Sequence, residues 1–279
     1  MHSRAAVIMA ANLVVLLAVS RPAVAADASA WDGTQRAAIR LIAGERRLAK
    51  GATIDRAGIE IRLAEGWKTY WRYPGDAGIP PRFGFAGSRN VKSITVRYPA
   101  PQRLADESGT SIGYKHDVTF PLEIVPEDAG KPVTVSLQIE YAVCEKICVP
   151  ADGKAELTLS GKPGEHDGRL AQVEALVPRA ARVGDDGALS IRAARREDKR
   201  IVVDVAAPAG VELFAEGPRD DWALPVPAPI AGAPPGQQRF AFELDGLPPG
   251  EKPDGAILRL TAVVGGQAIE VPLRLDSPN

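Results

Sequence analysis

The sequence contains few of the residue types on which most catalytic and metal sites depend. It has two cysteines, Cys144 and Cys148, and three histidines, of which only His116 and His166 lie beyond the first residues. Both methionines lie within the first nine positions. Structural zinc sites use four ligands at recognisable spacings, and two cysteines with scattered histidines fall short of that number. We therefore expect no bound metal and no resident cofactor.

Motifs for several other chemistries are also missing. The sequence has no Ser-His-Asp signature, no phosphate-binding loop and no glycine pattern for a dinucleotide. Lysine and arginine together number 34, against 35 aspartates and glutamates, which gives a formal net charge of −1. Proteins that bind nucleic acid carry a basic patch or a strongly basic pI. We therefore expect no nucleic-acid partner.

The sequence also lacks an apolar run long enough to cross a bilayer, which takes about 20 residues. The apolar run at residues 5–19 is shorter, follows the basic Arg4 and precedes the small-residue pattern AVA at residues 23–25. These features are typical of a cleaved secretory signal peptide, which we predict over residues 1–26. An uncleaved anchor is the alternative, because Arg21 lies beside the cleavage region. We expect a periplasmic, soluble mature chain with no transmembrane segment after signal cleavage.

Glycine and proline, by contrast, are abundant, with 27 and 24 residues spread between short apolar runs. Apolar and polar residues alternate at residues 59–63, 94–98, 118–124 and 133–143. An alternation of apolar and polar residues, interrupted by glycine and proline, indicates half-buried strands of antiparallel sheets. Short strands at regular spacing are typical of a β-sandwich.

The alternation stops at residues 161–188, which favour a short helix. Asp167 can cap this helix, and a shared apolar face is formed by Leu170, Val173, Leu176 and Val177. Six further strand candidates follow it, at residues 189–193, 200–207, 211–216, 238–246, 256–266 and 268–276. We predict an all-β fold of two immunoglobulin-like β-sandwich domains joined by a short helical connector. The expected boundaries are 27–162 for the first domain, 163–184 for the connector and 185–279 for the second domain.

The two cysteines raise the main functional question, because they can form a structural bridge, a metal site or a redox pair. A disulfide needs Cα atoms about 4.4–6.8 Å apart, whereas four extended residues span about 13 Å, so the chain must turn between Cys144 and Cys148. Asp152-Gly153 is a second turn signal, with a return strand expected over residues 154–160. We therefore expect the pair at the accessible tip of a hairpin, with Cys144 pointing away from the core.

Loop length helps to choose among these roles. Closing a five-residue loop contributes about 2 kcal/mol in the chain-entropy model, against about 4.7 kcal/mol for a loop of about 100 residues. A chain of this size builds its own core and gains little from so weak a staple. Exposed short-loop disulfides are the reducible ones, so we favour a redox-active pair. A structural bridge and a Cu(I) site, which two soft thiolates can form, stay open as alternatives.

Two further groups of residues are candidates for binding a partner or covering the site. Aromatic residues make up only 5% of the chain but gather just before residue 74, where they form either a binding hot spot or part of the core. A polar loop at residues 104–114 carries acids that can raise a thiol pKa and move protons, or that are simply solvated. The candidates are Trp67, Tyr70, Trp71, Asp106, Glu107 and Tyr114.

Three stretches, in this order, resemble the amino-terminal periplasmic domain of the DsbD disulfide reductase family, most closely its ScsB-like branch. They are GWKTYWRYPGDAGIPP from residue 66, SIGYKHDVTFPL from residue 111 and EYAVCEKICVPADGKAELTL from residue 140. The resemblance implies an immunoglobulin-like fold with a redox-active cysteine pair on a hairpin. It also implies that Cys148 forms the mixed disulfide, that Cys144 resolves it, and that loop residues such as Tyr114 shield the pair.

The same resemblance implies a function as a thiol–disulfide oxidoreductase that needs no cofactor. Such a protein relays electrons between a membrane-linked reductant and periplasmic thioredoxin-like or disulfide-isomerase-like partners. DsbD continues into membrane helices and a thioredoxin-like domain, and neither follows in this sequence, so we expect a separate membrane electron carrier. Whether the chain is an enzyme in its own right or a relay stays open. The alternative function is a Cu(I)- or protein-binding sandwich that contributes to copper tolerance.

Overall fold

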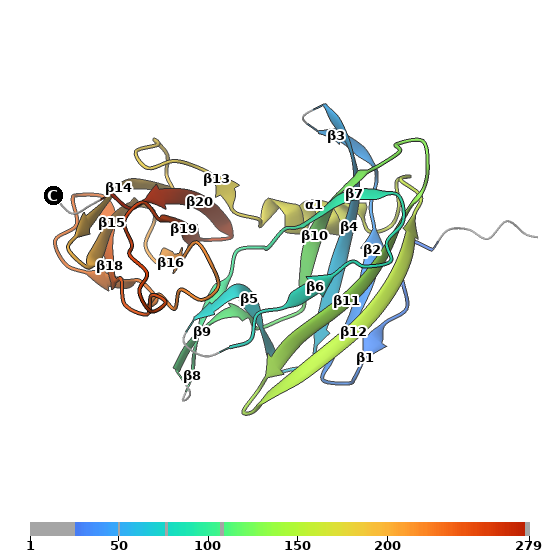
Figure 1. The fold of residues 1–279 in the computed structure, drawn as a ribbon, viewed down its shortest axis with the longest axis horizontal. Helices are drawn as coiled ribbons and strands as arrows, with labels where there is room; N and C mark the ends of the chain where they lie inside the picture. Colours follow the sequence, from blue (N-terminus) through green and yellow to red (C-terminus); the bar gives the residue numbers. More distant parts are fainter. Residues whose placement is uncertain (1–25, 50, 76–77, 107–108, 277–279) are drawn as a thin grey trace, which may run out of the picture.

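The computed structural model describes residues 26–49, 51–75, 78–106 and 109–276, almost all of them in strands, turns and connecting loops (Figure 1). Residues 1–25, which hold nearly all of the predicted signal peptide, lie outside the described residues. Four sheets form two sandwiches, which we call the N-terminal sandwich (β1 to β12) and the C-terminal sandwich (β13 to β20). The predicted all-β fold of two immunoglobulin-like sandwiches with a helical connector is confirmed, whereas the exact domain boundaries stay predictions.

The N-terminal sandwich consists of two six-stranded sheets. The first has the order β1 (Asp32–Gly33), β2 (Ala37–Ala43), β4 (Ala52–Leu63), β10 (Val118–Pro126) and β7 (Val91–Val96), with β3 (Arg47–Ala49) paired to β4. The second has the order β12 (Cys148–Leu159), β11 (Val133–Cys144), β5 (Lys68–Gly75), β9 (Gly109–Tyr114) and β8 (Gln102–Asp106), with β6 (Arg82–Gly84) paired to β11. Every one of these strand pairs is antiparallel.

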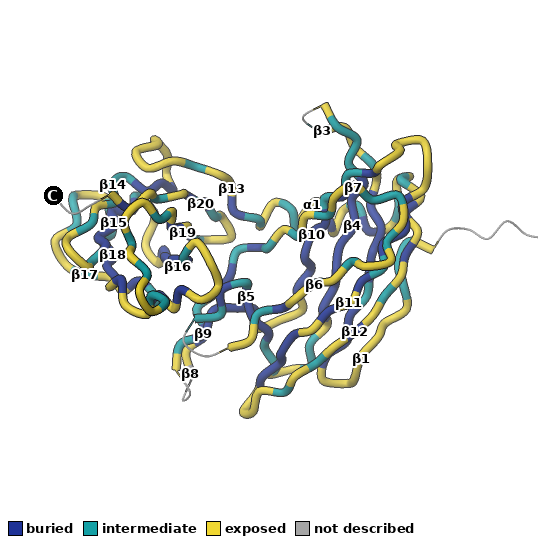
Figure 2. Tube along the Cα trace, in the orientation of Figure 1, coloured by how far each residue is buried: buried dark blue, intermediate teal, exposed yellow. Residues whose placement is uncertain are grey.

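The core of the N-terminal sandwich follows from the alternation in the sequence. Strand β11 contributes its odd-numbered residues from Val133 to Val143, and β10 faces them with Phe120, Leu122 and Ile124. Successive side chains of a strand point to opposite faces, so a period of two buries one face against the other sheet. Figure 2 shows these strands as buried and the tip of the β11–β12 hairpin as exposed.

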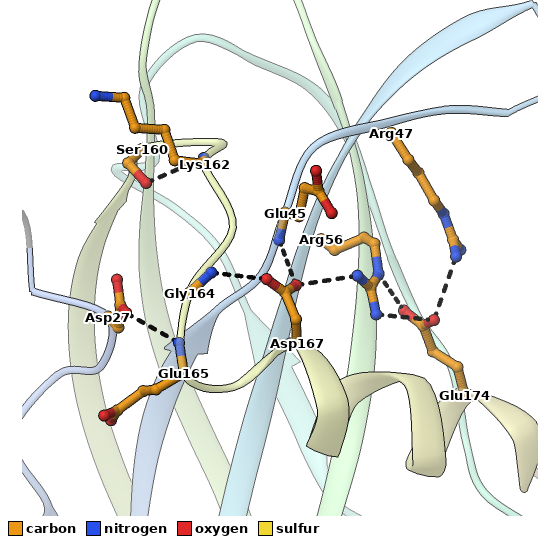
Figure 3. Close-up of polar contacts among 10 residues, drawn as sticks. All are labelled: Asp27, Glu45, Arg47, Arg56, Ser160, Lys162, Gly164, Glu165, Asp167 and Glu174. Carbon is orange, nitrogen blue, oxygen red and sulfur yellow. Dashed lines mark hydrogen bonds and ion pairs between the residues drawn. The ribbon is translucent and has the colours of Figure 1, made fainter.

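Helix α1 (Asp167–Ala175) covers the outer face of the first sheet of the N-terminal sandwich, the one that contains β4 and β10. Its buried Leu170 packs so closely on β4 that a Cβ atom at Gly58 would lie 2.9 Å from Leu170 Cδ2. The Arg56 guanidinium of β4 donates to Glu174 Oε1 at 2.8 Å and to Asp167 Oδ1 at 3.1 Å (Figure 3). Paired hydrogen bonds between ionised groups are among the stronger polar contacts in proteins, so they anchor the helix to this sandwich.

Two details of the predicted helix are wrong. The N-cap residue is His166, not Asp167, and its side chain makes no capping bond. The Asp167 carboxylate instead accepts hydrogen bonds from the backbone N–H groups of Glu45 and Gly164, which fasten the helix to neighbouring loops (Figure 3). Leu176, expected on the apolar face, lies beyond the helix and is exposed, because the helix already ends at Ala175.

The C-terminal sandwich pairs two four-stranded sheets. One has the order β13 (Arg179–Ala180), β20 (Gln267–Arg274), β19 (Ile257–Val264) and β16 (Glu212–Glu216). The other has the order β14 (Ser190–Glu197), β15 (Arg200–Ala206), β18 (Gln237–Glu243) and β17 (Ala228–Ile230). The six strands expected from the sequence are all present, and the short β13 and β17 are additions.

The two sandwiches join through a buried contact rather than through the connector alone. One continuous apolar cluster includes core residues of both sandwiches. At the junction the rings of Trp71 on β5 and Phe214 on β16 lie 6.0 Å apart. Arg103 on β8 reaches across to Glu212, 3.5 Å away, and donates to the carbonyl oxygen of Pro227 at 2.9 Å. The C-terminal sandwich is therefore packed against the sheet that carries both cysteines.

Within the part of the chain that the structure describes, no helix is long and apolar enough to span a membrane.

Candidate active site

A disulfide between Cys144 and Cys148 closes the tip of the β11–β12 hairpin. The two residues stand directly opposite each other in the antiparallel register, with Cα atoms 4.2 Å apart. Glu145, Lys146 and Ile147 form the turn between them, so the chain reverses between the cysteines as expected.

The second predicted turn, at Asp152-Gly153, is wrong. Both residues lie inside β12, where Gly153 pairs with Ile139. The hairpin has already reversed at the cysteines, so the strand runs on without a break. A Cβ atom at Gly153 would lie 2.5 Å from Ile39 Cγ1, so glycine is needed here for close packing on β2 rather than for a turn.

The two cysteines differ in their exposure to solvent. Cys144 is 2% exposed and belongs to a small buried cluster with Tyr70 and Ala142, apart from the main core. The expectation that it points away from the main core is confirmed, but the expected access to both cysteines is wrong. Cys148 is exposed, at the start of the edge strand β12. Cys148 is therefore the more accessible cysteine of the pair.

The Tyr70 side chain covers Cys144 and contacts both sulfur atoms. Its hydroxyl oxygen lies 2.7 Å from Cys144 Sγ and 3.1 Å from Cys148 Sγ. Tyr70 is 1% exposed and Cys144 is 2% exposed, so the contact between them is buried, whereas the contact with Cys148 is only partly buried. Hydrogen bonds to ionised groups are stronger than neutral ones, so a phenol placed here can stabilise a thiolate after the disulfide is reduced.

Two local features place Tyr70 at the sulfur atoms. Strand β5 pairs with the end of β11, with Lys68 opposite Cys144, and Thr69 Oγ1 donates to the carbonyl oxygen of Ala142 at 2.9 Å. On its other side, β5 pairs with β9 so that Tyr70 stands opposite Gly113. A Cβ atom at Gly113 would lie 2.1 Å from the Thr69 carbonyl oxygen, so only glycine permits this approach.

A groove of about 650 Å³ opens beside the hairpin tip. Its lining includes Trp67, Leu104, His116 and Glu145, the residue that directly follows Cys144. Ile147, between the cysteines, is 75% exposed. Exposed apolar side chains next to a groove are typical of surfaces that bind another protein. Among the described residues, no group of three or more His, Cys, Asp or Glu side chains is arranged to hold a metal ion.

The structure brings together some of the other candidate residues and separates the rest. Trp67 is partly buried and lines the groove, with the Arg36 guanidinium 5.6 Å from its ring centre. Trp71 is 0% exposed, because the C-terminal sandwich covers it, and it cannot contact a partner in this arrangement. Tyr114 is a core residue whose hydroxyl donates to the carbonyl oxygen of Pro99, so it does not shield the sulfurs.

The predicted acids cannot be placed in the same way. Asp106 is the last residue of β8, and its side chain lies outside the described residues, as does the whole of Glu107.

Burial raises the pKa of the Tyr114 hydroxyl well above its ordinary value. A raised pKa fits a phenol that stays neutral in the core and takes no part in proton transfer.

Sequence reasoning missed Arg72, which lies two residues after Tyr70. Its guanidinium makes two hydrogen bonds of 2.7 Å to the buried Glu216 carboxylate and one to Glu270. Burial alone would lower the pKa of Arg72, but the hydrogen bonds and charges of the two glutamates raise it above the ordinary value. No local pattern reveals such a contact, because its partners lie 144 and 198 residues away in the sequence.

An exposed cysteine and a buried cysteine, joined by a disulfide across a short loop beside a phenol, are suited to thiol–disulfide exchange. Residues 40–160 match the family described as thiol:disulfide interchange protein DsbD, N-terminal. The resemblance to the DsbD amino-terminal domain family inferred from the sequence is therefore confirmed for this part of the chain.

The fold of most of the chain is similar to a solved structure. This is the crystal structure of the N-terminal periplasmic domain of ScsB from Proteus mirabilis, which matches with a TM-score of 0.69 at 19% sequence identity. The match covers 90% of this chain and 99% of that one, so it includes both sandwiches. A search of curated protein sequences gave no significant match.

Proposed function

We propose that this chain is a periplasmic relay that passes electrons through the Cys144–Cys148 pair to thioredoxin-fold proteins. The observation that carries the proposal is the unequal exposure of the two cysteines, whose sulfurs both contact the Tyr70 hydroxyl. The matched ScsB structure is that of a periplasmic domain, which supports a location outside the cytoplasm, where disulfides persist. A separate membrane-linked carrier supplies the electrons.

The reaction begins with the reduced pair. The Cys148 thiolate attacks one sulfur of the partner disulfide, a new bond forms between them, and the partner's other sulfur leaves as a thiolate that takes up a proton. The Cys144 thiolate then attacks Cys148 Sγ, which restores the internal disulfide and releases the partner's second thiolate. Two electrons pass from this chain to the partner, and the membrane-linked carrier returns them by the same steps in reverse.

The assignment of roles follows from access. Thiol–disulfide exchange needs the attacking sulfur to approach the partner disulfide in line, and only Cys148 is exposed. Cys144 is buried against Tyr70, which keeps it away from an external disulfide but within reach of Cys148. The reverse assignment would require the hairpin and Tyr70 to separate before each reaction.

The surface beside Cys148 gives the partner a place to bind. Ile147 is an exposed apolar residue in the turn between the cysteines. Glu145, in the same turn, lines the groove together with Trp67. A central apolar contact with a polar rim is typical of specific interfaces. We expect the partner to cover Ile147 as its disulfide meets Cys148.

Partner trapping tests these roles. The reduced Cys144→Ala variant is mixed with a purified thioredoxin-fold disulfide isomerase in its oxidised form, and the products are separated on non-reducing gels. We expect a stable mixed disulfide through Cys148, because the resolving thiol is absent. The matched Cys148→Ala variant should give at most a tenth as much, because its remaining sulfur is buried.

Equal trapping by both variants would contradict the assignment of roles. No trapping by either variant, together with stoichiometric Cu(I) binding by the reduced wild-type protein, would instead support the metal-binding alternative.

A further inference from the structure

Strand β5 departs from regular pairing directly after Tyr70. Tyr70 pairs with Gly113 of β9, and the next pair joins Gly75 to Ser111. Five steps along β5 therefore correspond to two steps along β9, so the segment from Trp71 to Pro74 bulges out of the ladder. Bulges of this kind redirect side chains and weaken local pairing, so the path of β5 here depends on other contacts.

The C-terminal sandwich supplies those contacts, one after another along the bulge. Trp71 packs on Phe214 of β16. The Arg72 guanidinium forms a bidentate ion pair with Glu216 and also donates a hydrogen bond to Glu270 of β20. The Tyr73 hydroxyl lies 3.0 Å from the carbonyl oxygen of Trp222 and 2.8 Å from that of Leu224. Three consecutive residues after Tyr70 are thus held by the other sandwich.

We propose that Arg72 is a positioning residue, through which the C-terminal sandwich holds the Tyr70 hydroxyl against the two active-site sulfurs. This inference rests on the proposed exchange function, because it concerns the reactivity of the same cysteine pair. Among these three contacts, the one made by Arg72 constrains β5 most. Two hydrogen bonds from a planar guanidinium to a buried carboxylate fix both the distance and the orientation of the two groups. The C-terminal sandwich is then part of the redox apparatus, although it contains no cysteine.

Arg72 affects the thiolate through the hydrogen bond from the Tyr70 hydroxyl, whose length depends on the position of the β5 backbone. In the reduced protein the Tyr70 hydroxyl donates to the thiolate of Cys148, which stabilises the ionised form and makes it more abundant at neutral pH. Hydrogen-bond strength falls steeply beyond its normal distance and angle. A small shift of β5, following the loss of Arg72, removes this stabilisation while leaving the fold intact.

The test is a double-mutant cycle on Arg72→Gln and Tyr70→Phe in the full chain. The readout is the rate at which iodoacetamide alkylates Cys148 in the reduced protein, followed by mass spectrometry from pH 5 to pH 10. We expect each single variant to react about 3–10 times more slowly at pH 7, because a tenfold loss of thiolate corresponds to about one pKa unit. The double variant should react no more slowly than Tyr70→Phe alone, because Arg72 acts through Tyr70.

A matched control separates this effect from simple loss of stability. Arg239 Nη2 donates a hydrogen bond of 2.8 Å to the buried Asp204 within the C-terminal sandwich. Both residues are distant in the sequence from the junction at β5. Arg239→Gln therefore removes a similar pair and should leave the alkylation rate of Cys148 unchanged. If Arg72→Gln does not fold, Glu270→Gln removes one partner only and should give a smaller change in the same direction.

Two outcomes would overturn the inference. One is a wild-type alkylation profile in a folded Arg72→Gln or Glu270→Gln variant. The other is additive slowing in the double variant, which would mean that Arg72 acts on the thiol independently of Tyr70. In either case wild-type exchange with an oxidised thioredoxin-fold protein would persist, so the proposed function would stand. Loss of exchange in the wild-type protein would instead refute the proposed function itself.

Discussion

The hydroxyl of Tyr70 lies 2.7 Å from the sulfur of Cys144, in a small buried cluster that is separate from the main core. The same oxygen lies 3.1 Å from the sulfur of the exposed residue Cys148. One phenol therefore contacts both atoms of the disulfide that forms and breaks in the proposed electron relay. We therefore expect Tyr70 to influence the reactivity of the pair.

Replacing Tyr70 by phenylalanine should make the pair a stronger reductant. A hydrogen bond to a charged group contributes about 1.5–3 kcal/mol, and about 1.4 kcal/mol corresponds to 30 mV for a two-electron couple. Because the phenol stabilises the thiolate of the reduced form, its loss should shift the potential by about 30–60 mV to more negative values. The measurement is equilibration in glutathione buffers with quantification of free thiols.

Tyr141→Phe provides the matched control for that measurement. Tyr141 lies three residues before Cys144 on β11, but it faces the main core, and its hydroxyl has no hydrogen-bond partner among the described residues. Its removal should leave the potential within experimental error. An equal shift in both variants would contradict a specific role for the Tyr70 hydroxyl.

Substitution of Ile147 tests the proposed partner surface. Burying an isoleucine side chain contributes about 1.5–3 kcal/mol, so Ile147→Asn should slow exchange with an oxidised thioredoxin-fold protein by roughly tenfold. The reduction potential should not change, because the side chain does not stabilise either redox state. Leu48→Asn is the control, since Leu48 is equally exposed but lies on β3. Comparable slowing in both variants would mean that Ile147 has no special part in binding.

A side chain at Gly113 should disturb both the fold and the site. The Cβ atom of Gly113→Ala would meet the backbone of Thr69 and Tyr70 at 2.1 and 2.9 Å, so β5 and β9 must move apart. We expect a loss of about 3 kcal/mol in the free energy of unfolding, together with slower alkylation of Cys148. In Gly84→Ala the nearest atom would be 3.7 Å away, and stability should change little. Wild-type stability of Gly113→Ala would contradict the close approach of these strands.

The Asp204–Arg239 pair predicts a pH dependence of stability. Hydrogen bonds from Arg239 hold the pKa of Asp204 below its ordinary value in the folded protein. The resulting stabilisation is complete above the unfolded pKa of about 3.9 and is lost as the pH falls through the lower folded pKa. Asp204→Asn should therefore cost about 1–3 kcal/mol at pH 7 in urea unfolding, and progressively less below pH 4. A difference that stays constant down to pH 2 would contradict this account.

The sequence predicted the elements whose structure depends on local pattern. Alternation identified β11 over almost its full length, and the period of two correctly assigned Cys144 to the face away from the main core. The same logic failed at Asp152-Gly153, because glycine serves there for close packing on Ile39 and not for a turn. Composition alone cannot distinguish these two uses of glycine.

The features that depend on distant parts of the chain were beyond the reach of periodicity. The sequence left open whether Trp71 binds a partner or belongs to the core, because the residues that bury it, such as Phe214, belong to the other sandwich. The contact between Tyr70 and the sulfurs likewise requires the register of β5 against β11, which no local signal specifies. Side chains that meet only through tertiary packing need the structure to bring them together.

The reduction potential of the Cys144–Cys148 pair in the wild-type protein is the most direct test of the account. The purified chain is equilibrated in thiol redox buffers, and the oxidised and reduced forms are quantified after alkylation. A working exchange couple should have a potential between about −270 and −120 mV, the range spanned by thioredoxin and a strong periplasmic oxidant. A value below about −300 mV would identify a structural bridge and would contradict the proposed function.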